Sequence, residues 1–474
     1  MLVAAAIAAV FGLASGWLTP RGPTTSLEAL LTMAGGAIVG FAAGAFRRSR
    51  WSLLLAPAAF VVALEVARLG AVGPTVDGLR LGSLFGIIAL VLGRGLDYLL
   101  ALLPMAIGAI VGIGLTSRSG DRSKPIGAWG WTFTGVAAAG LVALAVAIAI
   151  PASTAPVLAG ESPNSIAELI DVEIGGHRQA MMIRGRNADA PVLLYLAGGP
   201  GGTDIGAVRR DVGLEQDFVV AVWEQRGAGK SYSALDPAET LTLEQLISDT
   251  IDATNYLRER FDEDRIYLVG NSWGTTLAAL AVQRRPELFH AYVGTGQMVS
   301  QNATDRLFYE DALAWAEATG NEGLAAALVA NGPPPYDDIW KYEPIVNSEH
   351  DWNAYPGFNP DQEMPAILFV PEYTLLDKLN AFPAFLDSAS IVYPQIQDVD
   401  LRQDVPGLEV PVYIIQGEHE ARGRAILALE WFDVLEAPAK EFVVFEASGH
   451  RPHFERPGEF AETMRRVLDE TYPR

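Results

Sequence analysis

The strongest constraint on the fold of this chain lies at residues 131–150, where WTFTGVAAAGLVALAVAIAI runs for 20 residues without a charge. As a helix, a stretch of this length crosses a hydrocarbon core of ~30 Å. Lipid offers no partners for backbone N–H and C=O groups, so a spanning stretch has to be helical. Further apolar stretches precede it at 2–18, 28–46, 52–69, 81–93 and 97–115. Residues 1–150 are therefore predicted to form an all-α transmembrane bundle of five or six spans.

Basic loops predict the orientation of this bundle, because Lys and Arg gather on the cytoplasmic side of a membrane. The basic residues lie in RRSR (Arg47, Arg48 and Arg50) and in SRSGDRSK (Arg118, Arg122 and Lys124). If the 13-residue stretch 81–93 does not cross, five spans put both loops inside and the rest of the chain outside. If it crosses, the second basic loop and the rest of the chain lie on opposite sides. We expect five spans, an integral protein of a bacterial plasma membrane, and an extracytoplasmic soluble domain.

The charge balance divides the chain at the same place. Residues 1–150 hold ten of the 34 basic and five of the 56 acidic residues, which leaves a net charge of −27 on residues 151–474. So acidic a domain argues against nucleic-acid binding, which needs a positive surface. The chain has no cysteine, which excludes disulfides, thiolate catalysis and cysteine-based metal sites. We expect no cofactor and no metal, and the sequence sets no oligomeric state.

After a linker at 151–168, short apolar runs alternate with helical segments. The runs lie at 191–198, 217–224, 265–270, 290–296, 411–417 and 441–447. Near-continuous apolar runs are typical of strands buried on both faces of a parallel sheet. Helices are predicted at 243–261, 273–284 and 457–470. This alternation predicts an α/β domain over 169–474, with a helical, proline-rich cap inserted at about 300–405.

One serine stands between two glycines directly after a predicted strand. The segment GNSWG (270–274) fits G-x-S-x-G, with a strand before it and a helix after it. In that context Ser272 projects from a tight, strained turn as a candidate nucleophile, and the glycines leave room for neighbouring backbone. The helix N-terminus offers the backbone N–H of Trp273 to a developing oxyanion. A second donor is expected in the glycine-rich LAGGPGG, from Gly198 or Gly199.

A nucleophilic serine needs a base and a carboxylate that orients it, which follow in the order acid, then histidine on this scaffold. His450 lies in the loop that leaves the last predicted strand, and His453 is the alternative base. The acid is expected in the loop after 411–417, where Glu420 is preferred over Glu418.

Four segments resemble α/β-hydrolases of the proline iminopeptidase (prolyl aminopeptidase) type. AGGPGG resembles the HGGPG loop of that family, WEQRGAGKS its DQRGxGxS strand end, GNSWGTT its GxSWG elbow, and SGH its catalytic-histidine loop. The resemblance covers about 165–474 and implies the α/β-hydrolase fold, a mostly parallel sheet flanked by helices with an inserted helical cap. By resemblance the catalytic residues are Ser272, Glu420 and His450, with Gly198 and Trp273 as oxyanion donors.

Three positions depart from the family pattern. Ala197 replaces the usual His, Glu224 the usual Asp, and Glu420 the usual catalytic Asp. Glu420 keeps the charge but lengthens the arm by one methylene, so its loop has to adjust. The family binds a free amino terminus through carboxylates of the cap. Residues 301–400 hold 17 acidic and three basic residues, and Glu310 is our candidate for that role.

The sequence thus predicts a membrane-anchored serine hydrolase, with a small peptide or ester and the lipid bilayer as its partners. The leading hypothesis is an aminopeptidase of proline iminopeptidase type, which removes an N-terminal residue from short peptides through an acyl-enzyme. A carboxylesterase or lipase acting on small esters is the alternative. A second alternative is a non-catalytic membrane sensor or transporter with a hydrolase-like ligand-binding domain. Charges in or near the spans are often functional, here Glu65, Arg68, Arg94 and Asp97, but their spacing does not indicate a transport path.

Overall fold

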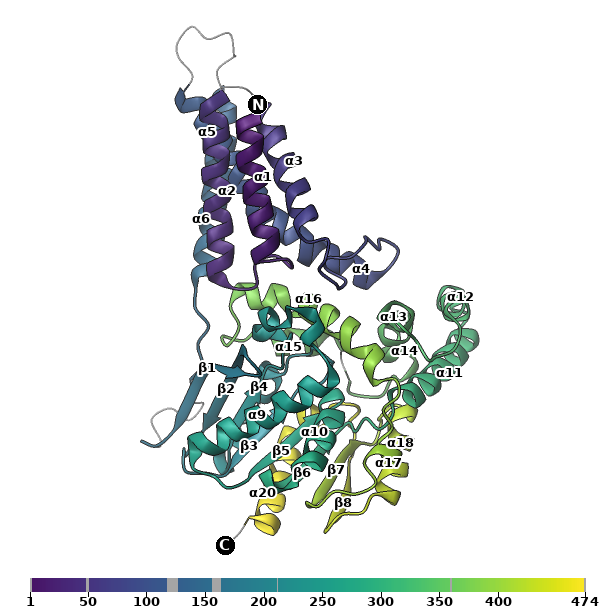
Figure 1. Ribbon diagram of the computed structural model, residues 1–474. Coiled ribbons are helices and arrows are strands. Elements are labelled where there is room, and N and C mark those ends of the chain that lie inside the picture. Colours follow the sequence, from purple (N-terminus) through teal and green to yellow (C-terminus); the bar gives the residue numbers. More distant parts are fainter. Residues whose placement is uncertain are drawn as a thin grey trace. The chain divides into compact units, whose positions relative to one another are not determined.

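The computed structural model describes residues 2–47, 51–116, 127–155, 163–210, 212–358 and 360–472 (Figure 1). The chain divides into two compact units, one of Met1–Pro151 with Thr374–Leu386 and one of Ala152–Tyr373 with Asp387–Arg474. The change from membrane-type to acidic sequence near residue 150 coincides with this division. The segment Thr374–Leu386 is part of the predicted cap in sequence, but it packs within the first unit.

The first unit is built from apolar helices that run side by side (Figure 1). Its long helices are α1 (Leu2–Leu18), α2 (Ser26–Arg47), α3 (Ser52–Ala67), α5 (Leu96–Thr116) and α6 (Ala128–Ala149). The short α4 (Leu84–Ile88) and the π-helix η1 (Ala89–Gly95) lead directly into α5. The predicted stretches 81–93 and 97–115 therefore share one helical run, Leu84–Thr116, of 33 residues. At 1.5 Å per residue this run is ~50 Å long, and it has no turn where a sixth span would begin.

Within the described parts of the chain, three helical runs are long and apolar enough to cross a membrane, namely Ser26–Phe46, Leu84–Thr116 and Trp129–Ala149. The helices Val3–Leu18 and Leu53–Ala67 are apolar but shorter. Of the basic residues that predict the orientation, Arg47 ends α2, and the others lie outside the described residues (Arg48, Arg50, Arg118, Arg122 and Lys124).

Glycines at a spacing of four bring the backbones of α2 and α5 close together. A Cβ on Gly36, Gly40 or Gly44 of α2 would lie 2.4, 1.9 and 2.2 Å from a carbonyl oxygen of α5. Gly108 and Gly112 of α5 fit against α2 in the same way, at 2.2 and 2.4 Å. Small residues at this spacing are typical of helix pairs in membranes, where close van der Waals packing replaces the hydrophobic effect. The packing of α2 against α5 therefore resembles that of helix pairs in membranes.

The four charged residues near the predicted spans pair with one another. The Nη2 atom of Arg68 lies 2.6 Å from Oδ2 of Asp97, and both side chains are buried. Glu65 lies 3.7 Å from Arg68 and 3.5 Å from Arg94. Because each charge has a partner of opposite sign, their arrangement is explained by the stability of the bundle.

The second unit contains an eight-stranded sheet in the order β1-β2-β4-β3-β5-β6-β7-β8. The strands are β1 (Ile166–Ile174), β2 (His177–Gly185), β3 (Val192–Leu196), β4 (Val219–Trp223), β5 (Ile266–Asn271), β6 (Phe289–Thr295), β7 (Val412–Gly417) and β8 (Lys440–Phe445). β2 pairs antiparallel with β1 and β4, and all other neighbours are parallel. The sequence predicts β3 to β8, but it misses the β1–β2 hairpin.

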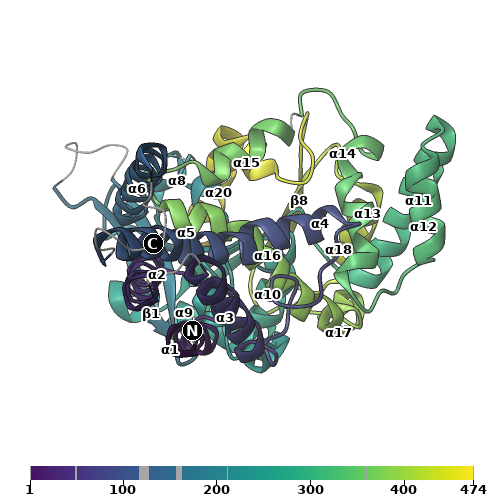
Figure 2. The ribbon, with the colours of Figure 1, turned by 90° about the horizontal axis from the view of Figure 1, so that it is seen from above.

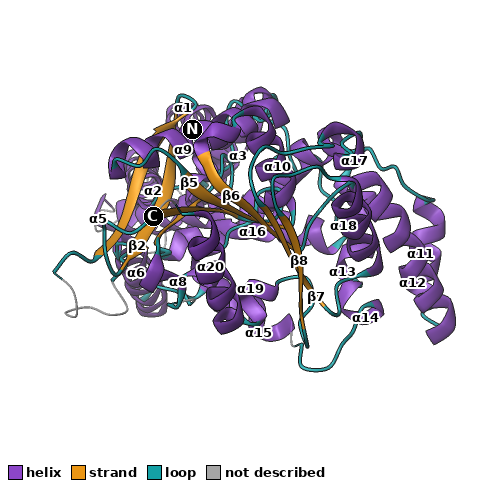
Figure 3. Ribbon diagram, turned by 90° about the horizontal axis from the view of Figure 1, so that it is seen from below, coloured by secondary structure: helices purple, strands orange, loops and turns teal. Residues whose placement is uncertain are grey.

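Helices cover both faces of this sheet (Figure 3). On one face lie α9 (Leu243–Phe261) and α10 (Trp273–Arg284), and on the other lie α8 (Leu214–Asp217) and α20 (Pro457–Thr471). Every residue of β3, β4 and β5 is buried, which is why their sequences read as unbroken apolar runs. The hydroxyl of Thr242 caps α9 by accepting the N–H of Gln245 at 3.1 Å.

The predicted cap, between β6 and β7, is all-helical (Figure 2). It contains α11 (Gln301–Thr319), α12 (Glu322–Asn331), α13 (Ile339–Asn347), α14 (Glu349–Trp352), α15 (Pro360–Leu368), α16 (Leu375–Val392) and α17 (Leu401–Asp404). The first half of α16 belongs to the first unit, where Leu376 is buried in one apolar cluster with Met33 and Leu100. There the amide of Asn380 donates to the carbonyl of Pro23 at 3.1 Å.

Candidate active site

Ser272 lies in a strained turn between β5 and α10. Its φ is +52° and its ψ is −124°, a conformation that is rare for a residue with a side chain. A Cβ on Gly270 would lie 2.5 Å from the carbonyl oxygen of Gly274, and one on Gly274 would lie 2.3 Å from that of Leu196. The two glycines therefore allow α10 to start directly against β3 and β5, with Ser272 held at the turn.

One buried glutamine connects three of the four segments that resemble the family. The indole Nε1 of Trp273 donates to Oε1 of Gln225 at 3.0 Å, and Nε2 of Gln225 donates to the carbonyl of Ala197 at 3.0 Å. A Cβ on Gly198 would lie 3.1 Å from the Cβ of Ser272, so the backbone of Gly198 packs against the serine. As the first residue of α10, Trp273 has a backbone N–H without an intrahelical acceptor. Both candidate oxyanion donors are thus next to Ser272.

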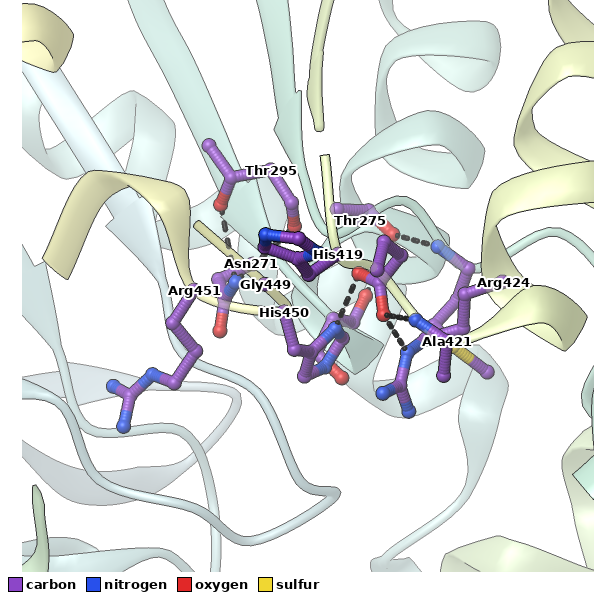
Figure 4. Close-up of polar contacts among 12 residues, drawn as sticks. Asn271, Thr275, Thr295, His419, Ala421, Arg424, Gly449, His450 and Arg451 are labelled. Carbon is purple, nitrogen blue, oxygen red and sulfur yellow. Dashed lines mark hydrogen bonds and ion pairs between the residues drawn. The ribbon is translucent and has the colours of Figure 1, made fainter. Parts of the chain in front are cut away.

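His450 and Glu420 form a hydrogen-bonded pair (Figure 4). The Nδ1 atom of His450 lies 2.8 Å from Oε2 of Glu420. The other oxygen, Oε1, accepts the N–H of Ala421 at 2.9 Å and Nε–H of Arg424 at 2.7 Å. Burial of Glu420 opposes its ionisation, but the charges of Arg424 and His450 outweigh burial and lower its pKa to about 2. Glu420 is therefore an ionised partner for the imidazole.

The end of β6 brings the serine and the histidine to the same place. The backbone N–H of Ser272 donates to the carbonyl of Thr295 at 3.0 Å. The next residue, Gly296, has a φ of +56°, and a Cβ there would lie 2.4 Å from the carbonyl oxygen of His450 and 2.8 Å from its Nδ1. Ser272 and His450 thus pack against adjacent residues of one strand end.

The alternative base His453 and the alternative acid Glu418 have partners other than His450 and Glu420. His453 is buried, with Nε2 2.7 Å from the hydroxyl of Tyr195, and burial holds its pKa well below the ordinary range. The carboxylate of Glu418 is half exposed and accepts the N–H of Ala447 at 3.2 Å. The structure joins His450 to Glu420 and gives His453 and Glu418 other partners.

A small cavity of about 110 Å³ adjoins His450. It is lined by Glu349, His350, Asn353, Tyr355, Phe358, Glu363, His450, Arg451 and Glu455. Glu310 is not among the described residues that line it; this side chain is exposed on α11 and pairs with Arg422 at 3.1 Å. Sequence reasoning missed the three lining glutamates. Only Glu455 gave a local signal, since it follows His450 by five residues in the sequence.

Two arginines balance two of these carboxylates. Arg424 pairs with Glu349 of α14 as well as with the carboxylate beside His450. Arg451 lies 2.6 Å from Glu363 of α15 and also pairs with Asp204. The cap helices α14 and α15 are thereby tied to the loops that carry the candidate acid and base.

Glu455, on the short α19 (Pro452–Glu455), has neutral donors instead. Its carboxylate accepts the hydroxyl of Tyr355 at 2.7 Å and the backbone N–H groups of Gly449 at 3.1 Å and Arg451 at 3.2 Å. Among the described residues it has no cationic side chain as a partner. Glu455 therefore adds a negative charge to the cavity wall and holds the loop on both sides of His450.

The segment RGAGKS folds around a buried carboxylate. Glu224 accepts the hydroxyl of Tyr373 and the backbone N–H of Lys230, each at 2.8 Å, and also the hydroxyl of Thr203. Burial raises the pKa of Glu224. The side chain of Arg226 is buried and pairs with Asp249 of α9 at 2.8 Å. These contacts explain the segment as a structural turn at the end of β4.

Comparison with known proteins identifies the family. Residues 191–457 match the family model described as alpha/beta hydrolase fold. The chain belongs to the α/β-hydrolase fold family. It is 33% identical over 312 residues to the probable aminopeptidase YbaC of Bacillus subtilis, and the matched region covers 64% of this chain and 96% of the relative. It is 23% identical over 304 residues to a proline iminopeptidase of Heyndrickxia coagulans, covering 61% of this chain and 94% of the relative.

Among solved structures, the proline iminopeptidase of Mycobacterium smegmatis matches with a TM-score of 0.43 and 20% identity, covering 64% of this chain and 98% of that chain. The predicted fold class and the predicted resemblance to proline iminopeptidases are confirmed by the family match and the relatives. About two thirds of this α/β-hydrolase chain matches nearly the whole probable aminopeptidase. The remaining third is additional to what that relative contains.

Proposed function

We propose that this chain is a membrane-anchored serine aminopeptidase that removes an N-terminal residue from short peptides. Ser272 attacks the carbonyl carbon of the first residue, while His450 takes the hydroxyl proton and returns it to the leaving amine. The backbone N–H groups of Trp273 and Gly198 stabilise the oxyanion. Water, with His450 as base, then hydrolyses the acyl-enzyme and releases the residue. The observation that carries this proposal is the pairing of His450 with the buried, ionised Glu420 at the strand end that also holds Ser272.

The electrostatics support these roles of His450 and Glu420. The imidazole of His450 becomes positive when it takes the serine proton, and Glu420 is already negative beside it. Its hydrogen bond to Nδ1 leaves Nε2 of His450 for the serine hydroxyl, because a neutral imidazole has one donor and one acceptor nitrogen.

The cavity beside His450 supports a substrate with a free amino group on one small residue. Its volume of about 110 Å³ is below the ~300–1,000 Å³ of sites for drug-sized ligands, so it suits one side chain better than a long acyl chain. The rings of Tyr355 and Phe358 stack at 5.1 Å and offer an apolar wall. The glutamates of the cavity favour a cation, and Glu455 has no cationic partner among the described residues. An N-terminal proline combines an ammonium group with a compact apolar ring.

The first unit supports the role of a membrane anchor. Its long apolar helices and its glycine-mediated packing suit a bilayer, and the basic loops of the sequence favour a hydrolase domain outside the cytoplasm. External protease added to intact spheroplasts should cleave the hydrolase domain, while a cytoplasmic marker protein stays whole. Protection of the domain until the cells are lysed would place it inside.

The peptidase hypothesis is tested on full-length protein in detergent micelles. Wild type should cleave prolyl and alanyl anilides, and it should not cleave the same anilides with an acetylated amino group. Ser272→Ala should lower the rate by at least ~10³-fold, as loss of a nucleophile does in comparable enzymes. Ser233→Ala removes an exposed serine and should change nothing. Hydrolysis of esters without cleavage of any anilide would replace the peptidase by an esterase. If a fluorophosphonate fails to label Ser272 in folded protein, a non-catalytic role is favoured.

A further inference from the structure

A chain of alternating charges leads from the candidate base to the cap. His450 bonds to one oxygen of Glu420 at 2.8 Å, and Arg424 bonds to the other at 2.7 Å. Arg424 then pairs with Glu349 of α14, which lines the cavity. Figure 4 shows His450 and Arg424 approaching the same carboxylate from two sides. Each charge in the series therefore has a neighbour of opposite sign.

The start of α18 (Arg422–Val434) is shaped to hold Arg424 in this place. The side chain of Arg424 is 6% exposed, and its guanidinium lies over the ring of Phe308 on α11, 4.7 Å from the ring centroid. A Cβ on Gly423 would lie 2.9 Å from that ring, so glycine is what allows α11 to approach this closely. The arginine is thus packed as well as paired, and it has little freedom to leave Glu420.

A glutamate in this position needs additional contacts to fix its carboxylate, more than an aspartate would. Its arm contains one more rotatable bond, so a hydrogen bond to His450 alone leaves the carboxylate free to swing. The N–H of Ala421 and the guanidinium of Arg424 hold Oε1 and thereby direct Oε2 at the imidazole. Arg424 also neutralises the buried carboxylate while His450 is uncharged, which stabilises the resting state.

We propose that Arg424 is a positioning residue, which fixes the second oxygen of Glu420 and connects that carboxylate to the cavity wall through Glu349. The inference rests on the proposed role of Glu420 as the acid of the catalytic group. Removing Arg424 takes a positive charge away from the pair and lets His450 hold its proton more tightly. Removing the charge of Glu349 makes His450 hold its proton less tightly, because Arg424 then pairs with Glu420 alone. If Arg424 had a merely structural role, the two substitutions would not shift the proton equilibrium of His450 in opposite directions.

Other charged groups also surround His450 and remain constant across this comparison. They are Glu363 and His350 from the cap, and Arg451, His453 and Glu455 from the loop and helix that follow His450. Arg422 is the matched control, because it lies on the same helix as Arg424 and also pairs with α11, at 2.8 Å from Asp311. Its side chain is 42% exposed and contacts neither member of the pair among the described residues.

The test is the pH dependence of fluorophosphonate labelling of Ser272, measured on the full-length protein in detergent micelles. In Arg424→Gln the acidic limb of the profile should move up by ~0.5–1 pH unit, and the plateau rate should fall ~10–100-fold. Arg424→Lys should keep the limb at its wild-type pH and recover part of the plateau. Glu349→Gln should move the limb down, and Arg422→Gln should match wild type.

An Arg424→Gln profile within twofold of wild type at every pH, or equal changes in Arg422→Gln, would overturn the proposal. If Arg424→Gln does not fold, Arg424→Lys and Glu349→Gln decide, and two profiles identical to wild type overturn it. Failure of the wild type to be labelled contradicts the proposed function instead. In that case the proton equilibrium of His450 is followed directly by NMR titration of its imidazole, where the same opposite shifts are expected.

Discussion

Gly296 allows a sharp test of how the strand end positions His450, because it lies outside the proposed catalytic group. A Cβ at this position would lie 2.4 Å from the carbonyl oxygen of His450 and 2.8 Å from its Nδ1, and real Cβ atoms stay beyond 3.0 Å. Gly296→Ala therefore pushes the histidine away by roughly 0.5–1 Å. A misplacement of ~1 Å can lower a rate ~10²-fold. The φ of +56° adds a backbone strain of about 1–2 kcal/mol to the folded state.

A second glycine with a similar backbone conformation distinguishes the effect of backbone strain from the effect of displacing His450. Gly320 ends α11 with a φ of +72°, and a Cβ there meets nothing within 4 Å. Both alanine variants should lower the melting temperature of the full-length protein, because both carry the same kind of backbone strain. Only Gly296→Ala should slow fluorophosphonate labelling of Ser272, by ~10–100-fold. Labelling of Gly296→Ala at the wild-type rate, or equal slowing in Gly320→Ala, would refute the proposed packing of His450 against this strand end.

Three further changes test the site and the two units. Gln225→Leu should lower kcat about 10-fold with little change in KM, because it releases the carbonyl of Ala197 and the indole of Trp273, and steady-state kinetics on the best substrate measure this. Burial raises the pKa of Asp305 from 3.8 to about 7, so the folded state holds an extra proton between those values and stability falls as pH rises through them. Asp305→Asn should remove this loss of stability, which is worth up to about 4 kcal/mol. If the melting temperatures of the variant at pH 5 and pH 8 differ by as much as those of wild type, this prediction is contradicted. Leu376→Ala should destabilise the first unit by about 2–5 kcal/mol, and an unchanged melting temperature would show that the side chain is not buried there.

The strands that the sequence predicts and the ones it misses differ in how many polar side chains interrupt their apolar runs. β3, β4 and β5 are buried along their whole length, so their residues form apolar runs that stand out from their surroundings. β1 is only partly buried over its first half, and its sequence lacks such a run. The pair Gly175–Gly176, where both residues have a positive φ, is the turn signal that could have revealed the hairpin.

The catalytic candidates could be predicted because they follow strands in a fixed order, whereas the cavity wall could not. Ser272, Glu420 and His450 each follow a strand of the parallel sheet, so topology alone brings them to one edge. Glu349 and Glu363 lie on short cap helices, and their positions depend on how those helices fold back over a long insertion. The sequence around Glu310 carries no such information, and in the structure this side chain is exposed on α11 with Arg422 as its partner.

The domain boundary shows a further limit of sequence reasoning. A sharp change in composition near residue 150 predicts a detachable membrane part, since nothing before residue 165 resembles the hydrolase family. Yet α16 is one continuous helix of 18 residues whose two halves belong to different units. In its first half Leu376 is buried with helices α2 and α5, and Phe382 packs edge-on against Phe85 at 5.9 Å. The apolar core of the first unit thus includes residues from the cap insertion. A chain shortened to residues 152–474 would expose both side chains to water, which is why each experiment above uses the full-length protein.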